Sequence, residues 1–349
     1  MAKRRTLTKH DLEGPPSPDG ESVRTESTWG LAWRRFRRHK LALLGGGVIA
    51  LFLFVAIFAP FLTPYDFSRQ NRRLGFSPPT LTVATDPDDL RLRDKCVRPQ
   101  VLFWKCTVHP FGTDDLGRDI LTRVMYGARV SLLVGFVAAL TATLLGALLG
   151  AAAAYFGGYL DSMISRFIDI MLSIPQLPLL LILVGLLNAA DIPFTRFLDE
   201  VLGQSKSIAI IILVIIALSW MSVARLVRGE ILSLREREFV EAARAIGVPT
   251  RRIILRHLLP NASHVIIVQA TLLVGEAILI ESGLSFLGLG IQPPAVSWGR
   301  MLAGAQEFLY WPYGIYSALF PGLFIFLTVL CFNFLGDGLR DALDPRSTR

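Results

Sequence analysis

The sequence has little charge for its length, and it lacks the phosphate-binding loop of the common ATP-hydrolysing enzymes. Of its 349 residues only 18% are charged and 52% are hydrophobic, and the mean hydropathy is +0.49. Soluble domains usually carry roughly 25% charged residues, so the composition excludes that class. No Gly-x-x-x-x-Gly-Lys-Ser/Thr segment occurs. We therefore expect the chain to bind no ATP and to be no enzyme by itself.

Cysteine is scarce too, with 3 in the whole chain. Cys331 lies in the last apolar run, and we expect it to be an inert packing residue. Cys96 and Cys106 share one polar loop, which we place outside the cytoplasm, where a disulfide can form. A metal site made by these two cysteines with His109 is the less favoured alternative.

The segment "GTDDLGRD" lacks the full ligand spacing of a calcium loop. It offers Asp114, Asp115 and Asp119, but a calcium loop needs oxygen ligands at more positions. We interpret the segment as a turn that ends in a helix cap, with Arg118 and Arg123 pairing locally. No metal site is predicted.

Long apolar runs, by contrast, are abundant. A bilayer core of roughly 30 Å takes about 20 helical residues to cross, and backbone groups cannot stay unpaired in lipid. The runs are continuous rather than alternating, so we predict an all-α, polytopic membrane protein. The six predicted spans are Leu41–Leu62, Val130–Ala154, Phe167–Leu187, Ile208–Val223, Val265–Ile280 and Tyr316–Leu335.

Two of these spans have unusual composition. The third contains "SIPQLP", and prolines inside a membrane helix are tolerated where neighbouring helices compensate for the lost hydrogen bonds. We therefore expect this span to be kinked and packed inside the bundle. The second contains "GALLGAAAAYFGG", whose small residues favour close helix packing over ligand contact.

Basic residues predict the orientation of the spans. Six fall in 34–40, counting His39, and 8 arginines fall in 225–256, whereas the loop before the fourth span has only Arg196 and Lys206. By the positive-inside rule, both termini and the loop between the fourth and fifth spans are cytoplasmic. The same clusters favour contact with membrane lipid over nucleic acid.

These spans and loops predict the organisation of the chain. The expected regions are a disordered cytoplasmic tail (1–28), an interfacial segment with the first span (29–62), an extracytoplasmic loop (63–128), a five-helix core (129–337) with a cytoplasmic loop at 224–261, and a cytoplasmic C-terminus (338–349).

The cytoplasmic loop contains "EAARAIGVPTRRIILRHLLP" (241–260). Helical spacing places Phe239, Ala242 and Ala243 on one face. Gly247 is expected to end this helix, and a second helix would start at Thr250 as its N-cap and end near Pro260. The unit is either a docking segment for a partner protein or an amphipathic connector lying on lipid.

The spacing of this loop resembles the EAA loop of ABC importer permeases, in which Glu-Ala-Ala, three residues, Gly and nine further residues precede Ile-x-Leu-Pro. His257 stands where that family has Ile, which leaves the Gly and Pro spacing unchanged. The segments 109–135, 282–302 and 332–346 resemble the C-type permeases of peptide and nickel transport. The resemblance covers nearly everything from about position 29 onward.

The resemblance implies a type I ABC importer permease fold in the inner, or cytoplasmic, membrane. Its partners would be a second homologous permease, two cytoplasmic ATPase subunits that hold ATP and magnesium, and an extracytoplasmic substrate-binding protein. This chain itself would bind no cofactor. The residues that would couple to the ATPase are Glu238, Glu241, Ala242, Ala243, Gly247 and Pro260.

Four ionisable residues in or near the spans are further candidates. Arg166 and Asp169 stand three apart, and we favour a structural ion pair between them over a functional role. Glu276 in the fifth span and Glu281 near its outer end are candidates for the substrate pathway. For these two residues, a hydrogen bond to a neighbouring helix or to the partner permease is the alternative.

The predicted function is import of di- or oligopeptides, with this chain as half of the pore. Nickel or its chelate is the alternative cargo. The rival from another class is an ion-coupled secondary transporter, which would show inverted repeats and charges at the membrane centre. We see no clear inverted repeat, and the cytoplasmic loop has no evident use in such a protein.

Overall fold

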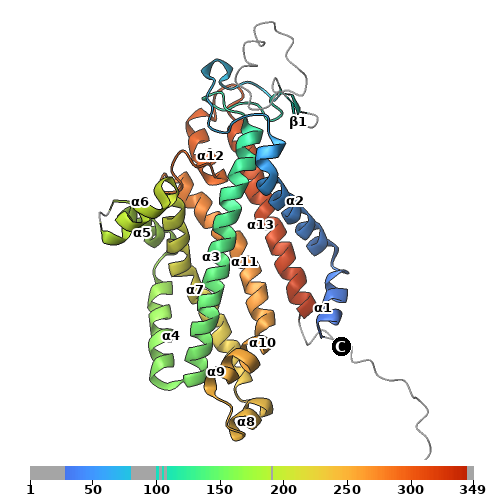
Figure 1. Ribbon diagram of the computed structural model, residues 1–349, viewed down its shortest axis with the longest axis vertical. Coiled ribbons are helices and arrows are strands. Elements are labelled where there is room, and N and C mark those ends of the chain that lie inside the picture. Colours follow the sequence, from blue (N-terminus) through green and yellow to red (C-terminus); the bar gives the residue numbers. More distant parts are fainter. Residues whose placement is uncertain (1–27, 80–99, 102–103, 106–107, 190–191, 344–349) are drawn as a thin grey trace, which may run out of the picture.

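The computed structural model describes residues 28–79, 100–101, 104–105, 108–189 and 192–343, and these are almost entirely helical (Figure 1). Most of the predicted N-terminal tail, Cys96 and Cys106 lie outside the described residues. The β-structure of the described residues is one short antiparallel pair, β1 (Gln100–Val101) with β2 (Trp104–Lys105), and an isolated bridge between Thr113 and Asp119.

The described residues include five helical runs that are long and apolar enough to cross a membrane. They are α2 (Lys40–Leu62), α3 (Ile120–Phe156), α6 (Pro193–Leu202) together with α7 (Lys206–Leu234), α11 (Ser263–Phe286) and α13 (Tyr316–Leu343). The pair α4 (Gly158–Ser173) and α5 (Gln176–Ala189) supplies a sixth crossing if it counts as one span. Each of the six predicted spans overlaps one of these runs or the bent pair, although several helices extend beyond their apolar centres.

The third span is broken rather than kinked. α4 and α5 meet at 94°, because Ile174 precedes Pro175 and takes an extended backbone (ψ 133°) that no helix can contain. The expectation that this span packs inside the bundle is wrong. Only Ile168, Leu180 and Val184 of the two helices are buried, and the pair lies at the side of the bundle (Figure 1).

Short elements connect and flank these helices. They are α1 (Thr28–Phe36), η2 (Arg72–Leu74), η4 (Gly203–Ser205), α8 (Glu238–Ala245), α9 (Thr250–Arg252), the π-helix η5 (Ile253–Leu258), α10 (Leu259–Asn261), α12 (Trp298–Ala305) and η6 (Gln306–Phe308).

The two ends of the bundle differ in what they carry. At one end lie α1, the segment from α8 to α10 and the last turns of α13, as Figure 1 shows. At the other end lie β1, α12 and the start of α3. The two basic segments and the C-terminal helix, which the prediction assigns to one compartment, are therefore on one side.

Close packing of α3 against α7 forms the centre of the bundle (Figure 1). Gly146 and Gly150 stand four apart on α3, and a Cβ on either residue would collide with α7 backbone, at Trp220 and Ala224 respectively. This is the small-xxx-small arrangement that lets membrane helices approach closely. The packing role predicted for the small residues of the second span is confirmed.

Candidate coupling site

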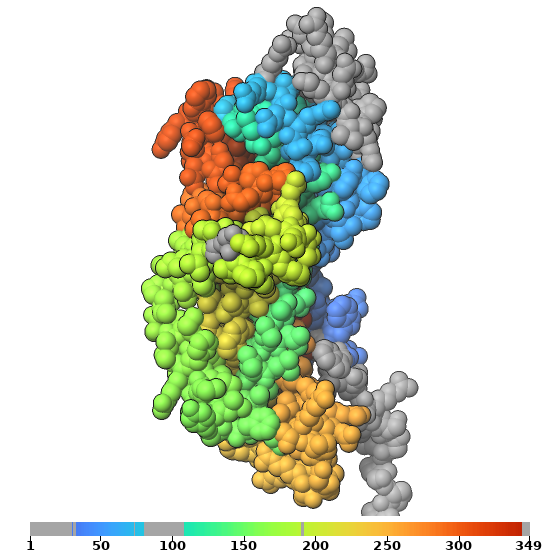
Figure 2. Space-filling model, turned by 60° about the vertical axis from the view of Figure 1, so that its left-hand side comes forward, coloured from blue at the N-terminus to red at the C-terminus, as the bar shows by residue number. Residues whose placement is uncertain are grey.

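The candidate coupling site is the segment from α8 to α10, which stands out at the lower end in Figure 2. α8 has eight residues and begins after Arg237, whose extended backbone (ψ 147°) separates it from α7. Glu238 and Glu241 lie in its first turn, where carboxylates interact favourably with the positive end of the helix dipole. Both side chains are exposed.

Gly247 ends α8 as the sequence predicts. Its φ is +77°, a left-handed conformation that glycine adopts without strain. The Gly247 N–H donates to the Arg244 carbonyl and the Val248 N–H to the Ala243 carbonyl, at 3.0 Å each. These bonds satisfy carbonyls that the end of a helix leaves open. The chain therefore turns sharply here.

α8 has one buried face and one exposed apolar face. Val240 and Ala243 are buried in the same core cluster as Ile253 of η5. Phe239 is 40% exposed and Ile246 is 80% exposed, and Ala242 lies between them on the outer surface. A partner protein can therefore reach Phe239, Ala242 and Ile246.

The predicted placement of Ala242 and Ala243 on one face of α8 is wrong, whereas the coupling role of Ala243 stays a prediction. Successive residues in a helix point about 100° apart, so Ala242 and Ala243 cannot share one face. Ala243, only 6% exposed, packs inward. The exposed stripe instead includes Ile246, which the sequence reading did not single out. Its spacing of seven from Phe239 is the signal that could have found it.

Two arginines hold this segment to the end of α3. The Arg244 guanidinium lies 5.0 Å from the centre of the Tyr155 ring, a cation–π contact. The Arg235 Nη1 donates to the Ala154 carbonyl at 2.6 Å. Arg244 thus connects α8, and Arg235 the turn before it, to the last residues of α3.

The second helix of the site begins one residue earlier than expected. Pro249, not Thr250, is the N-cap residue of α9, and no side chain caps it. Pro260 is exposed and follows the π-helix η5, in which the Leu259 N–H donates to the Ile254 carbonyl five residues back. A proline has no N–H and its ring clashes with the carbonyl four residues earlier. The wider turn before Pro260 relieves that clash.

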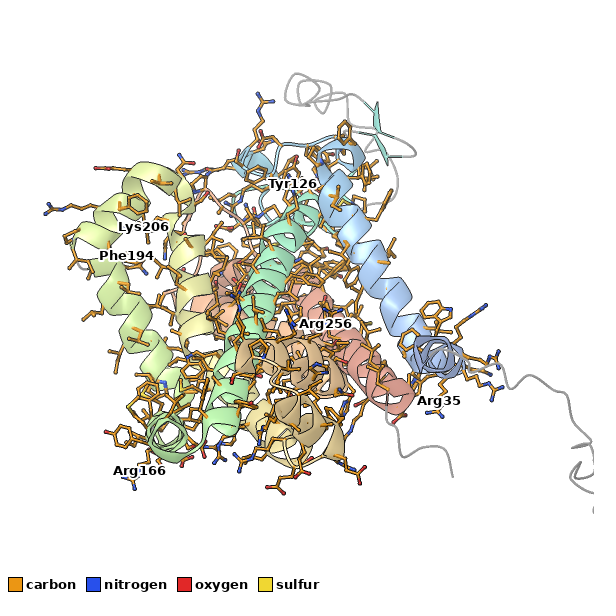
Figure 3. The ribbon with its side chains drawn as sticks, turned by 60° about the horizontal axis from the view of Figure 1, so that its bottom comes forward. Arg35, Tyr126, Arg166, Phe194, Lys206 and Arg256 are labelled. Carbon is orange, nitrogen blue, oxygen red and sulfur yellow. The ribbon has the colours of Figure 1, made fainter. Side chains whose placement is uncertain are left out.

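Two more arginines tie α7 to α4. Arg228 donates two hydrogen bonds to the Asp161 carboxylate, at 2.5 and 2.7 Å, and Arg225 pairs with Asp169 at 2.5 Å. The predicted pair of Arg166 with Asp169 is therefore wrong. Arg166 is exposed and projects from the outer side of α4 (Figure 3). Sequence reasoning missed these cross-helix pairs, whose only signal was opposite charges on two neighbouring apolar helices.

The two glutamates of α11 have different environments. Glu281 is fully buried, and it accepts hydrogen bonds from the hydroxyls of Ser285 at 2.8 Å and Ser131 at 3.3 Å. This burial removes Glu281 from the candidate substrate pathway, and the alternative of a hydrogen bond to a neighbouring helix holds. Glu276, near the middle of the helix, is exposed.

These features define a chain of membrane-length helices with a short helical segment exposed at one end. Residues 142–349 match the family described as binding-protein-dependent transport system inner membrane component. Residues 27–79 match the N-terminal transmembrane domain of oligopeptide transport permease C. The chain belongs to the family of binding-protein-dependent inner membrane permeases.

Curated relatives cover nearly the whole chain. It is 40% identical over 333 residues to the dipeptide transport system permease of Alkalihalophilus pseudofirmus, which covers 95% of both chains. It is 40% identical over 325 residues to the oligopeptide permease of Escherichia coli, covering 93% of each. It is 38% identical over 340 residues to a glutathione permease of another E. coli strain, covering 96% of this chain and 95% of that one.

Family membership confirms the class that the sequence predicts. The chain is the membrane permease subunit of an ABC importer, a transport component and not an enzyme. Such a subunit works with a substrate-binding protein and with ATPase subunits. The ion-coupled secondary transporter considered as a rival is excluded.

Proposed function

We propose that this chain forms one half of the pore of a di- and oligopeptide importer, beside a second homologous permease. The relatives named above are permeases for dipeptides, oligopeptides and glutathione, itself a small peptide. Their names favour peptides over the alternative cargo of nickel or its chelate.

The exposed carboxyl of Glu276 is the observation that supports a pore shared with a second permease. It lies mid-way along α11, and within the described part of the chain it has no hydrogen bond or ion pair. An ionisable side chain at membrane depth is costly in lipid and normally faces water or protein. The surface around Glu276 is therefore best explained if pore water or the second permease covers it.

The end that carries α8 is proposed to lie in the cytoplasm, together with both termini. Its basic residues fit the positive-inside rule, and its exposed stripe of Phe239, Ala242 and Ile246 suits a cleft in an ATPase subunit. Closure of two ATPase subunits on ATP would draw α8 and α7 toward an outward-open state. Hydrolysis would reset the pore, so the permease would act as a two-state switch biased by a ligand bound elsewhere.

Peptide uptake by the reconstituted assembly tests the cargo. The vesicles would contain this chain, the second permease, both ATPase subunits and the binding protein. We expect ATP-dependent uptake of labelled trialanine, without uptake of nickel under the same conditions. Uptake of nickel but not of peptide would reverse the assignment.

A cysteine placed at Glu276 tests the half-pore directly. With the three native cysteines replaced by serine, Glu276→Cys in the assembled transporter should react with a water-soluble maleimide or cross-link to the second permease. Glu281→Cys is the matched control on the same helix and should do neither, since that position is buried. Labelling of Glu276→Cys only by lipid-soluble reagents would contradict the proposal.

A further inference from the structure

A charged pocket lies at the end of the bundle opposite the coupling site. Its volume is about 460 Å³, within the range of small-ligand sites. Its charged lining comes from the turn before α3, from the first turn of α3 and from α12. The charged residues are Asp114, Asp115, Arg118, Arg123 and Arg300.

Three of these residues, Asp114, Arg118 and Arg123, pair with one another and form one side of the pocket. The Asp114 carboxylate accepts from Arg118 Nε at 2.7 Å and from the backbone N–H groups of Leu116 and Arg118 at 3.0 and 2.9 Å. Arg123, 7% exposed, lies 3.5 Å from the same carboxylate and donates to the Phe67 carbonyl at 3.3 Å. The local pairing predicted from the sequence is confirmed here.

The other two residues, Arg300 and Asp115, have weaker pairing within the described part of the chain. The Arg300 side chain makes no ion pair or hydrogen bond with any residue that the structure describes, although it lines the pocket. Among the described residues, Asp115 has one ion pair, with Arg118 at 3.6 Å, and that guanidinium also donates to Asp114 at 2.7 Å. Burial and the neighbouring Asp114 carboxylate raise the pKa of Asp115 above its ordinary value.

The pocket therefore offers one cation and one anion that do not pair with each other. A guanidinium binds a carboxylate in a fork of two hydrogen bonds, and a carboxylate binds an ammonium group. Met301 and Phe308 add apolar surface to the same pocket. A simple anion would leave Asp115 unmatched, and a metal cation would leave Arg300 unmatched.

We propose that this pocket binds a short zwitterionic peptide, with the peptide carboxylate at Arg300 and its ammonium group at Asp115. The site would hold cargo at the outer face before it enters the pore. This inference rests on the proposed peptide cargo and extends it by naming a site on the permease itself.

The test uses the full chain in phosphatidylcholine nanodiscs and an NMR titration with carbon-13-labelled trialanine. Trialanine amide and N-acetyl-trialanine, each lacking one terminal charge, are the comparison probes. We expect each blocked peptide to bind about tenfold more weakly than trialanine, which corresponds to one lost charged contact. Arg300→Gln should remove the preference for the free carboxylate only, and Asp115→Asn the preference for the free ammonium only.

Arg129→Gln is the matched control. Arg129 is an exposed arginine of α3 that lines the adjacent, largely apolar pocket, outside the charged one, and lies 6.0 Å from the centre of the Tyr126 ring. Its loss should leave all three affinities unchanged. Absence of trialanine binding, equal binding of the blocked peptides, or displacement by acetate at the same concentration would overturn the inference.

The uptake assay separates this inference from the proposed function. If the transporter imports peptide but the nanodisc titration shows no preference for free peptide termini, the proposed binding site is wrong and the proposed cargo stands. If the chain binds peptides with a preference for free termini but the assembled transporter imports no peptide, the proposed cargo is wrong and the binding site stands.

Discussion

Gly247→Trp is expected to abolish peptide uptake while the chain still inserts and folds. Gly247 has φ +77°, and nothing lies within 4 Å of the position a Cβ would occupy. A tryptophan there would strain the turn by about 1–2 kcal/mol, and its indole would point away from the bundle. If the outer face of α8 docks against an ATPase subunit, the indole would obstruct that contact.

The measurement is uptake and ATPase activity of the assembled transporter in vesicles. We expect uptake to fall at least tenfold and ATP hydrolysis to lose its dependence on transport. Gly203→Trp is the matched control, because Gly203 also has a positive φ (+50°) and open surroundings but precedes the first residue of α7, whereas α8 follows the last. Normal uptake by the Gly247 variant would contradict docking through α8.

Gly247→Ala distinguishes the effect of backbone strain at this turn from the effect of the bulky tryptophan side chain. It introduces the same unfavourable backbone conformation with a single added methyl group, so it should weaken the fold slightly and leave uptake largely intact. A loss as large as that of the tryptophan variant would assign the effect to the turn geometry and not to a partner surface.

The arginines around the coupling site explain how motion of α8 would spread. α7 has 29 residues and is therefore about 44 Å long, which reaches from α8 to the other end of the bundle. Arg225 and Arg228 tie it to α4, and Arg235 and Arg244 tie the segment after it to α3. A displacement of α8 would thus move α3, α4 and α7 together as a packed unit.

Local features of this fold could be predicted from the sequence, because each depends on neighbouring residues. The Asp119 cap of α3, whose carboxylate accepts from the Thr122 N–H at 2.7 Å, needs only a short polar segment before an apolar run. The interruption at Pro175, predicted as a kink and found as a break, and the turn at Gly247 likewise follow from backbone constraints on single residues.

Features that depend on distant residues could not be predicted. The sequence predicts Arg166, three positions away, as the partner of Asp169, whereas the actual partner Arg225 lies 56 residues further along the chain. Burial of Glu281 depends on Ser131, which is 150 residues distant. The charged pocket unites α12 with the turn before α3. Periodicity identifies helices and their faces, but it does not specify which face meets which neighbour.

The contact of α3 with α7 gives the second large expected effect: Gly150→Leu should destabilise the folded chain by about 3 kcal/mol or more. A Cβ on Gly150 would overlap the Ala224 carbonyl, and Gly146 meets α7 backbone in the same way one turn earlier. Backbone atoms of a packed helix cannot rotate aside as a side chain can. The two helices would have to separate, with loss of the packing that holds the centre of the bundle.

Gly229→Leu in α7 is the matched control, since Gly229 is helical and exposed, and nothing lies within 4 Å of its Cβ position. There the same substitution should be neutral or stabilising by up to about 1 kcal/mol, because leucine favours helix more than glycine does. Thermal unfolding of each variant in nanodiscs, together with the yield of folded protein, makes the comparison. Equal stability of the two variants would show that α3 and α7 do not pack through Gly150, and the rigid unit needed to transmit motion from α8 would lose its basis.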